Sequence, residues 1–147
     1  MTDNAVRHAD LAGAELGPSS WLDVGQGRID GFADATSDHH WIHVDAERAA
    51  GGPFGGTIAH GFLTLSLVIP LLAEVLPPTE GTMVNYGVDR VRFPTPLPSG
   101  SRIRGRFRVA SVEEHVRGAL PRVEATIERE GAEKPVCVAD LVLLLLG

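Results

Sequence analysis

The stretch IAHGFLTLSLVIPLLAEVL, residues 58–76, is apolar nearly all the way round a helix. A helix without a polar face has to be buried on all sides. Thr57 is placed to cap the first turn, because a threonine hydroxyl can accept from the free N–H groups there. Pro77-Pro78 stops the helix, and Pro70 inside it predicts a kink or an earlier end. We therefore expect one long buried central helix.

The chain before this stretch is typical of helix and loop. Residues 29–35 predict a short helix that ends before the polar cluster 36–40. Residues 46–50 predict a helical turn, which Gly51-Gly52-Pro53 must end because glycine and proline interrupt regular structure. The first half of the chain is therefore expected to carry loops and short helices around the start of the central helix.

After the central helix the pattern changes to a period of two. In residues 102–109 arginine alternates with mostly apolar residues, which predicts a strand with one solvated face. Further strands are predicted at 84–93, 122–130 and 135–146, with turns at 94–100, 115–118 and 131–132. An antiparallel β-sheet wrapped around one long buried helix is the α+β arrangement called the hot-dog fold.

Length and composition set the outer limits. The 147 residues, 44% of them hydrophobic, predict a single domain over 1–147 with a core from about 20 to 146. The net charge of −6 argues against a nucleic-acid partner, since recognition of a phosphate backbone needs a basic face. The apolar tail 141–146 is far short of a membrane helix.

The cysteine content and the N-terminus bear on location. Cys137 is the one cysteine, so no intramolecular disulfide can form and a reducing compartment fits best. Residues 1–8 lack a basic segment followed by an apolar stretch, so no secretory signal is readable. We expect a soluble, cytoplasmic protein with no membrane association.

Residues 38–61 concentrate the unusual chemistry, including four of the six histidines. Asp38 and His43 flank the segment His39-His40-Trp41-Ile42, and Asp45 follows two positions after His43. After a glycine-rich spacer, Ala59-His60-Gly61-Phe62 opens the central helix. A carboxylate and an imidazole near a helix start could together handle protons and a developing negative charge.

On these residues the chain resembles the MaoC-like, R-specific enoyl-CoA hydratase family. The family signature is Asp-x-Asn-Pro-x-His, an acidic residue two positions later, and Ala-His-Gly at the start of the central helix. The resemblance covers about residues 20–145, including 85–87 and 91–100. The family's Asn-Pro pair is His40-Trp41 here, which removes a rigid proline ring and is similar to a single-domain branch with the pattern Asp-His-x-Trp-Ile-His.

The resemblance implies a lyase of fatty acid metabolism that adds water to a trans-2-enoyl-CoA to give the (R)-3-hydroxyacyl-CoA, or runs the reverse dehydration. No redox cofactor is implied, because coenzyme A belongs to the substrate. Family members pair two hot-dog domains so that their sheets join. A chain with one such domain is therefore expected to form a homodimer.

The resemblance also assigns roles in the reaction. Asp38 and His43 hold a water between them, one accepting its proton and the other supplying a proton to C2. The backbone N–H of Gly61 fits the enolate oxygen, because the first N–H groups of a helix are unpaired and lie at the positive end of its dipole. Glycine there also lets the thioester approach closely.

The expected substrate contacts are completed by His60, Ser66, Trp41, Phe54 and Arg92. His60 is expected to orient the helix start rather than to react. For Ser66 the alternative is a helix hydroxyl that bonds back to a carbonyl. Trp41 and Phe54 could line an acyl tunnel or pack against the core.

Arginines on the period-two strand raise the question of a phosphate site for coenzyme A. The stripe consists of Arg102, Arg104, Arg106 and Arg108. The next strand offers Glu124, Glu128 and Glu130 at matching alternation, so cross-strand ion pairs on a solvated face explain most of it. Arg92 is a separate phosphate candidate beside the Phe93-Pro94 turn.

Three rival interpretations stay open. His39, His40 and His43 could hold a metal, although further ligands at tight spacing are missing, so we expect none. A hot-dog thioesterase would need a carboxylate on the central helix, where only Glu74, near its end, is available. A non-catalytic acyl-thioester-binding module is the third interpretation, and His40-Trp41 keeps it open.

Overall fold

The computed structural model describes residues 6–147. The first five residues of the expected domain, part of the stretch without a readable secretory signal, lie outside it. In chain order the elements are η1 (His8–Leu11), β1 (Glu15–Leu16), β2 (Leu22–Val24), α1 (Gln26–Thr36), α2 (Trp41–Val44), α3 (Ala46–Ala50), α4 (Gly61–Val75), β3 (Thr82–Arg92), β4 (Ser101–His115), β5 (Gly118–Arg129) and β6 (Cys137–Leu146).

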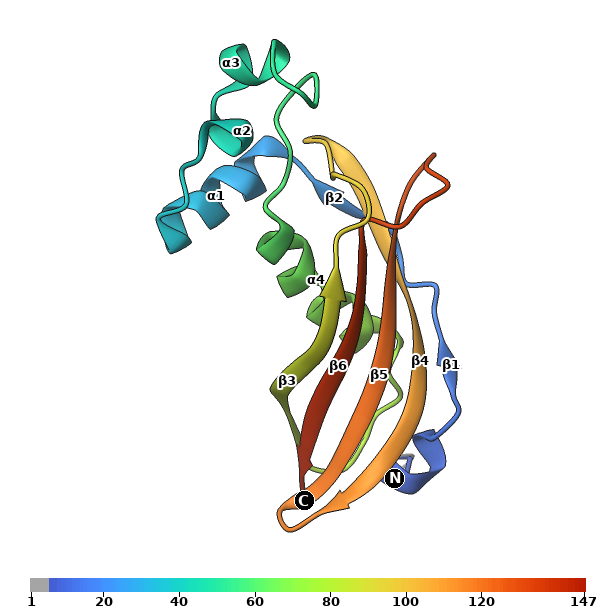
Figure 1. Ribbon diagram of the computed structural model, residues 1–147. Coiled ribbons are helices and arrows are strands. Elements are labelled where there is room, and N and C mark those ends of the chain that lie inside the picture. Colours follow the sequence, from blue (N-terminus) through green and yellow to red (C-terminus); the bar gives the residue numbers. More distant parts are fainter. Residues whose placement is uncertain (1–5) are drawn as a thin grey trace.

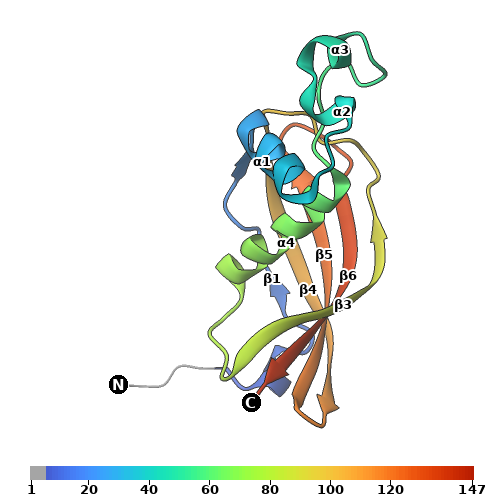
Figure 2. The ribbon, with the colours of Figure 1, turned by 90° about the vertical axis from the view of Figure 1, so that its left-hand side faces the viewer.

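The strands form one curved sheet that holds α4 against one face. The sheet order is β1-β4-β5-β6-β3, with β2 also paired to β4, and the pairings between these strands are antiparallel. Figures 1 and 2 show α4 packed along the sheet. In both figures the helices α1, α2 and α3 gather beyond the N-terminal end of α4. The α+β layering predicted from the sequence is confirmed.

The period-two segment 102–109 lies in β4, and its arginines pair with the next strand as predicted. Arg104 Nε lies 2.8 Å and Arg106 Nε 2.7 Å from Glu128 carboxylate oxygens. Arg108 reaches Glu124 at 3.1 Å and Arg102 reaches Glu130 at 3.2 Å. These contacts define an arginine–glutamate ladder on the solvated face of β4 and β5, so the stripe is accounted for by its cross-strand partners.

The central helix begins later than the sequence predicted. Ala59 N–H donates to the Leu97 carbonyl at 2.8 Å and Ile58 bridges Pro98, so both are held in extended backbone. The helix starts at Gly61 with His60 as its N-cap residue, and it continues through Pro70. The prediction that Thr57 caps it was wrong, because the Thr57 hydroxyl donates to the Gln26 side chain instead.

Only one side of α4 faces the core. Its buried residues are Leu63, Thr64, Leu67, Val68, Leu71 and Leu72. On the opposite side Phe62 is 71% exposed. The prediction of burial on all sides was therefore wrong for the single chain, because the sheet of one chain covers one side of a helix.

The apolar tail 141–146 forms the end of β6, most of it buried in the sheet. Among residues 6–147, none of the helices combines the length and the apolar character needed to cross a membrane.

Candidate active site

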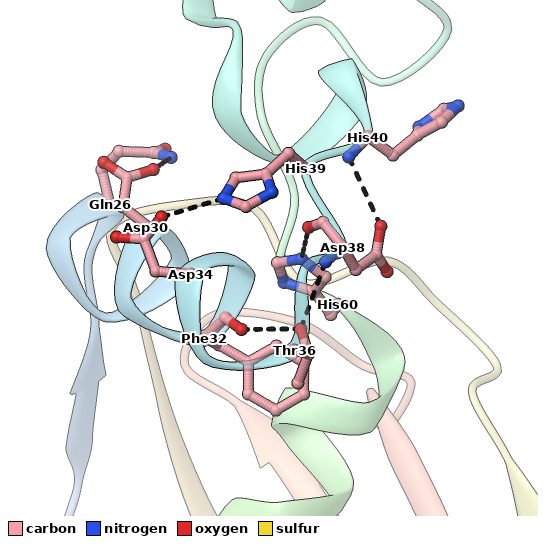
Figure 3. Close-up of polar contacts among 9 residues, drawn as sticks. All are labelled: Gln26, Asp30, Phe32, Asp34, Thr36, Asp38, His39, His40 and His60. Carbon is pink, nitrogen blue, oxygen red and sulfur yellow. Dashed lines mark hydrogen bonds and ion pairs between the residues drawn. The ribbon is translucent and has the colours of Figure 1, made fainter.

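The end of α1 sets the position of Asp38. Ser37 follows the helix in left-handed backbone with φ 63°, which turns the chain sharply after Thr36. Asp38 N–H then donates to the Thr36 hydroxyl at 3.4 Å, and Asp38 Oδ1 accepts from His40 N–H at 3.4 Å (Figure 3). The Asp38 carboxylate is exposed, so this turn presents it to solvent at the corner.

His43 lies in the short helix α2 and is buried, with 8% exposure. Its Nδ1 lies 2.7 Å from the Ile58 carbonyl oxygen. Because a carbonyl can only accept, Nδ1 carries the proton, and the neutral ring presents Nε2 as an acceptor. The backbone therefore selects one tautomer of His43.

The surroundings of His43 favour this neutral form. Burial lowers the pKa of His43, because a charged ring loses hydration there. The hydrogen bond to Ile58 and the charge of Asp38 act in the opposite direction, while His60 and His40 add to the lowering. The net effect is a pKa below the ordinary value, so the ring is neutral and can accept a proton near neutral pH.

His60 joins the corner to the helix start. Its Nε2 donates to the Asp38 backbone carbonyl at 2.9 Å, and its ring stacks on His43 with centroids 3.8 Å apart and planes inclined at 26° (Figure 3 shows the first contact). The ring also packs on Phe32 at 4.8 Å. His60 is 3% exposed, and Nδ1 is buried without a partner among residues 6–147. The orienting role expected for His60 agrees with these contacts.

Asp38, His43 and His60 form the corner cluster. Each offers one potential ligand atom, and these atoms lie within 4.8 Å of one another. An ion bound by both rings would lie in both ring planes, about 2 Å from each nitrogen. The two rings are stacked instead, and one nitrogen of each is engaged with a backbone carbonyl, so we interpret the cluster as a site for a hydrogen-bonded water rather than for a shared ion.

The contacts of His39 also argue against a metal site formed by His39, His40 and His43. His39 is half exposed, and its Nε2 pairs with Asp34 at 2.9 Å, a residue on α1 (Figure 3). The structure therefore places His39 outside the corner cluster.

Gly61 opens α4 next to the cluster. Among the described residues, its N–H has no hydrogen-bond partner, as expected for the first turn of a helix. A Cβ added here would lie 2.9 Å from the ring of Phe93. Close packing of Phe93 is therefore one physical reason for glycine at this position, beside the approach of a substrate.

Phe54 and Gly61 share a cavity of about 300 Å³ at the N-terminal end of α4. Phe93 and Leu97 also line it. Phe54 is partly exposed, consistent with a place at the mouth rather than in the core. The structure thus brings Phe54 together with the candidate oxyanion site.

The departure His40-Trp41 has a local explanation. His40 is the N-cap residue of α2 and Trp41 its first residue, where proline is well tolerated but other residues also fit. Trp41 lies under the Arg48 guanidinium at 4.3 Å and against Gly52. Trp41 is thus placed by packing against α3 and the glycine loop, on the side where Asp45 caps α3 through Arg48 N–H.

Two predicted contacts lie elsewhere. The Ser66 hydroxyl donates to the Phe62 carbonyl at 2.7 Å, which is the back-bonding alternative of the sequence analysis. Arg92 is exposed at the end of β3 and donates to the Val91 carbonyl. Neither is brought to the corner cluster.

One residue near the site was missed by sequence reasoning. The Gln26 amide, on α1, contacts His43, Thr57 and Asp30. A glutamine in the first turn of a helix has no sequence signature, and its partners become neighbours only when the chain folds.

Comparisons with known proteins identify a matching family and similar chains. Residues 8–131 match the family described as the MaoC like domain. The 3-hydroxyacyl-thioester dehydratase Z of Mycobacterium tuberculosis is 47% identical over 138 residues, covering 92% of this chain and 91% of that protein. Nodulation protein N of Rhizobium leguminosarum bv. viciae is 50% identical over 139 residues, covering 90% and 85%.

A solved structure gives the same fold. The unliganded R-hydratase PhaJ1 from Pseudomonas aeruginosa superimposes with a TM-score of 0.77 at 24% identity, over 95% of this chain and 84% of that chain. The hot-dog fold predicted from the sequence is therefore confirmed.

Proposed function

This chain belongs to the MaoC-like dehydratase family, and we propose that it hydrates trans-2-enoyl-CoA to (R)-3-hydroxyacyl-CoA and catalyses the reverse dehydration. The observation that carries the proposal is the corner cluster, where a buried His43 with a free acceptor nitrogen lies beside the exposed Asp38 carboxylate. The 3-hydroxyacyl-thioester named for a relative supports the substrate class.

The two residues divide the proton transfers. His43 Nε2 accepts a proton from water as the water oxygen bonds to C3, and the Asp38 carboxylate takes this proton from His43 and delivers it to C2. The hydroxyl of the water is then on C3 and its proton on C2, so His43 is neutral and Asp38 is ionised again, as at the start. This order follows from the tautomer of His43, which leaves Nε2 as the acceptor.

The developing enolate oxygen is placed at the Gly61 N–H. A free helix N–H at the positive end of the dipole stabilises such a charge, and loss of one oxyanion donor costs about 10²–10³ in turnover in other enzymes. Coenzyme A is part of the substrate, and the addition of water is not a redox reaction. The proposal therefore includes no redox cofactor.

The reaction is tested with crotonyl-CoA and longer enoyl-CoAs. Loss of the conjugated thioester absorbance reports hydration, and free thiol reports hydrolysis. Hydration without thiol release and an (R)-3-hydroxyacyl product are expected. Thiol release would establish a thioesterase, and binding without either reaction would establish a non-catalytic module.

The residues are tested with Asp38→Asn and His43→Gln, each expected to lower turnover by about 10²–10⁴ while the fold stays intact by circular dichroism. Asp34→Asn is the matched control, because Asp34 is an exposed aspartate near this corner that pairs with His39 instead. Near-normal turnover in either site variant would contradict the assigned pair.

The thioesterase alternative has little geometric support. Glu74 lies 13 residues beyond Gly61 on α4, about 20 Å along the helix. Its carboxylate accepts from the Ser20 hydroxyl at 2.6 Å and from Ser20 N–H at 2.7 Å, and these bonds lower the pKa of Glu74. Glu74 is therefore engaged far from the corner cluster.

A homodimer completes the proposal. β3 ends the sheet order, and between β3 and α4 lies an apolar groove of about 570 Å³. The groove is lined by Phe62, Leu65, Ser66, Ile69, Pro70, Asn85, Tyr86, Gly87, Val88 and Leu141. An unpaired edge strand beside an exposed apolar helix face is what a second copy would cover.

Sedimentation velocity tests the assembly. Tyr86→Lys is expected to convert a dimer into a monomer, because it puts a charge on the exposed side of β3. Val116→Lys is the control, since Val116 is 95% exposed at the β4–β5 turn. A dimer that persists in Tyr86→Lys, or a monomeric native chain, would contradict this interface.

A further inference from the structure

We infer that Gln26 is a positioning residue for His43, holding the short helix α2 so that the imidazole meets Asp38 and substrate in one orientation. The expected effect on turnover rests on the proposed function. The expected effect on the position of the His43 ring rests on hydrogen bonds alone.

Gln26 is the first residue of α1, and its side-chain amide donates two hydrogen bonds and accepts one. Nε2 donates to the His43 backbone carbonyl at 2.7 Å and to Asp30 Oδ1 at 2.8 Å. Oε1 accepts from the Thr57 hydroxyl at 2.7 Å. A primary amide supplies both functions at one side chain, the donor for His43 and the acceptor for Thr57.

The hydrogen bond from Gln26 satisfies a backbone carbonyl of His43 that the short helix α2 leaves free. α2 has four residues, and the carbonyls of a last helical turn have no intrahelical partner. An isolated helix of this length has almost no stability of its own. The amide of Gln26 satisfies one of these carbonyls at the residue whose side chain is proposed to react.

Thr57 extends the link to the other side of the site. It lies one residue before Ile58, whose carbonyl fixes the tautomer of His43 and whose N–H donates to Ile42. Gln26 thus ties the backbone of His43 to the segment that receives its ring. Figure 3 shows Gln26 and Asp30 on α1, on the side of the helix away from the Asp38 carboxylate. The inference therefore assigns Gln26 an action through His43, to whose backbone carbonyl it donates.

Gln26→Leu tests the inference, because leucine keeps the size and removes both polar functions. We expect kcat to fall by about 10- to 100-fold, since small displacements of a reacting group have effects of that order. We expect KM to change by less than about threefold, and the urea midpoint to fall because the His43 carbonyl and the Thr57 hydroxyl lose a part-buried partner. Asp30→Ala removes the third partner of the amide alone and is expected to keep kcat within about twofold.

A second variant covers failure to fold. Thr57→Val removes the other end of the link and is expected to lower kcat in the same direction. If Gln26→Leu unfolds, Thr57→Val decides. A kcat within about twofold of the native value in a folded Gln26→Leu, or in Thr57→Val when that variant decides, would overturn the inference.

An NMR titration of the His43 imidazole separates this inference from the proposed function, since it needs no turnover. The native ring is expected to show the Nδ1–H tautomer, and its signals are assigned by their loss in His43→Gln. In Gln26→Leu the ring should show mixed tautomers and a pKa closer to that of an exposed histidine. Unchanged tautomer and pKa would overturn the positioning role, even if the native chain proved inactive on enoyl-CoA.

Discussion

The corner cluster and the arginine–glutamate ladder both concentrate ionisable side chains, yet the structure treats them oppositely. In the ladder the charged groups meet one another at the surface, and Arg108 and Glu124 are each about half exposed. In the corner cluster the rings of His43 and His60 are buried and bonded to backbone carbonyls.

The difference shows how a site is distinguished from a solvated face. Ladder partners satisfy each other's charge across the two strands. A backbone carbonyl instead fixes which nitrogen of a histidine is protonated and leaves the other nitrogen free. Burial combined with backbone anchoring is therefore the better indicator of chemistry than the number of charges.

Among the substitutions that test this comparison, the largest loss of turnover is expected at His60. His60→Phe keeps a ring to stack on His43 but loses the bond to the Asp38 carbonyl. We expect turnover of enoyl-CoA to fall by about 10- to 100-fold, because Asp38 loses an anchor. His39→Phe, at an exposed histidine next to Asp38, is the control, and its turnover should stay within about twofold of the native value. Equal effects of the two changes would contradict the anchoring.

The pH dependence of the cluster is the next effect in size. Because burial lowers the pKa of His43, the ring stays neutral to a lower pH than an exposed histidine at about 6.5. We expect the acidic limb of kcat/KM to lie below pH 6.5 and to fall about tenfold per pH unit. A limb above pH 6.5 would contradict His43 as the base.

The same shift predicts a stability change with a definite sign. Unfolded chains take up a proton on His43 at a higher pH than folded ones, so this contribution is complete above about pH 6.5 and is lost as pH falls through the lower folded pKa. Urea unfolding of the native chain and of His43→Gln between pH 5 and pH 7.5 measures it. The loss on acidification should be smaller in the variant.

Loss of one ion pair in the arginine–glutamate ladder is expected to change stability and turnover only slightly. Arg108→Gln removes one exposed ion pair, and such pairs contribute about 0–1 kcal/mol. We expect the free energy of unfolding to change within that range and turnover to stay within about twofold. A large loss of turnover would place the ladder among the substrate contacts and remove the contrast drawn above.

The smallest expected effect concerns Cys137. Burial raises the pKa of this thiol to about 11, since a charged thiolate is poorly solvated there. Iodoacetamide at pH 7.5 should leave the folded chain unmodified by mass spectrometry and should modify it in urea. Rapid labelling of the folded chain would show that burial does not control reactivity in this core.

Several elements could be predicted from the sequence because their causes are local. Alternating arginine in 102–109 marked β4, and glycine with proline after Ala50 marked the end of α3. The start of α4 could not be placed, because Ile58 and Ala59 are drawn into extended backbone by Leu97 and Pro98, about 40 residues away. Apolar character does not distinguish such a segment from the first turn of a buried helix.

The features of the site likewise fall into two groups, those that the sequence predicts and those that only the fold brings together. Asp38, His43 and Gly61 stand at spacings that family resemblance makes readable. The Gln26 link, the stacking of His60 on His43 and the contact of Phe93 with Gly61 join distant segments. No local pattern records these contacts, because each requires the chain to have folded.

The sequence by itself determined the strand pattern, the apolar helix and the acid–histidine spacing, since these depend on periodicity and on neighbours along the chain. Only the tertiary structure decided which nitrogen of His43 is free, which face of α4 is left uncovered and which residues hold the site. Those features depend on backbone carbonyls and on packing brought together from separate segments, as His43 and Ile58 are, 15 residues apart.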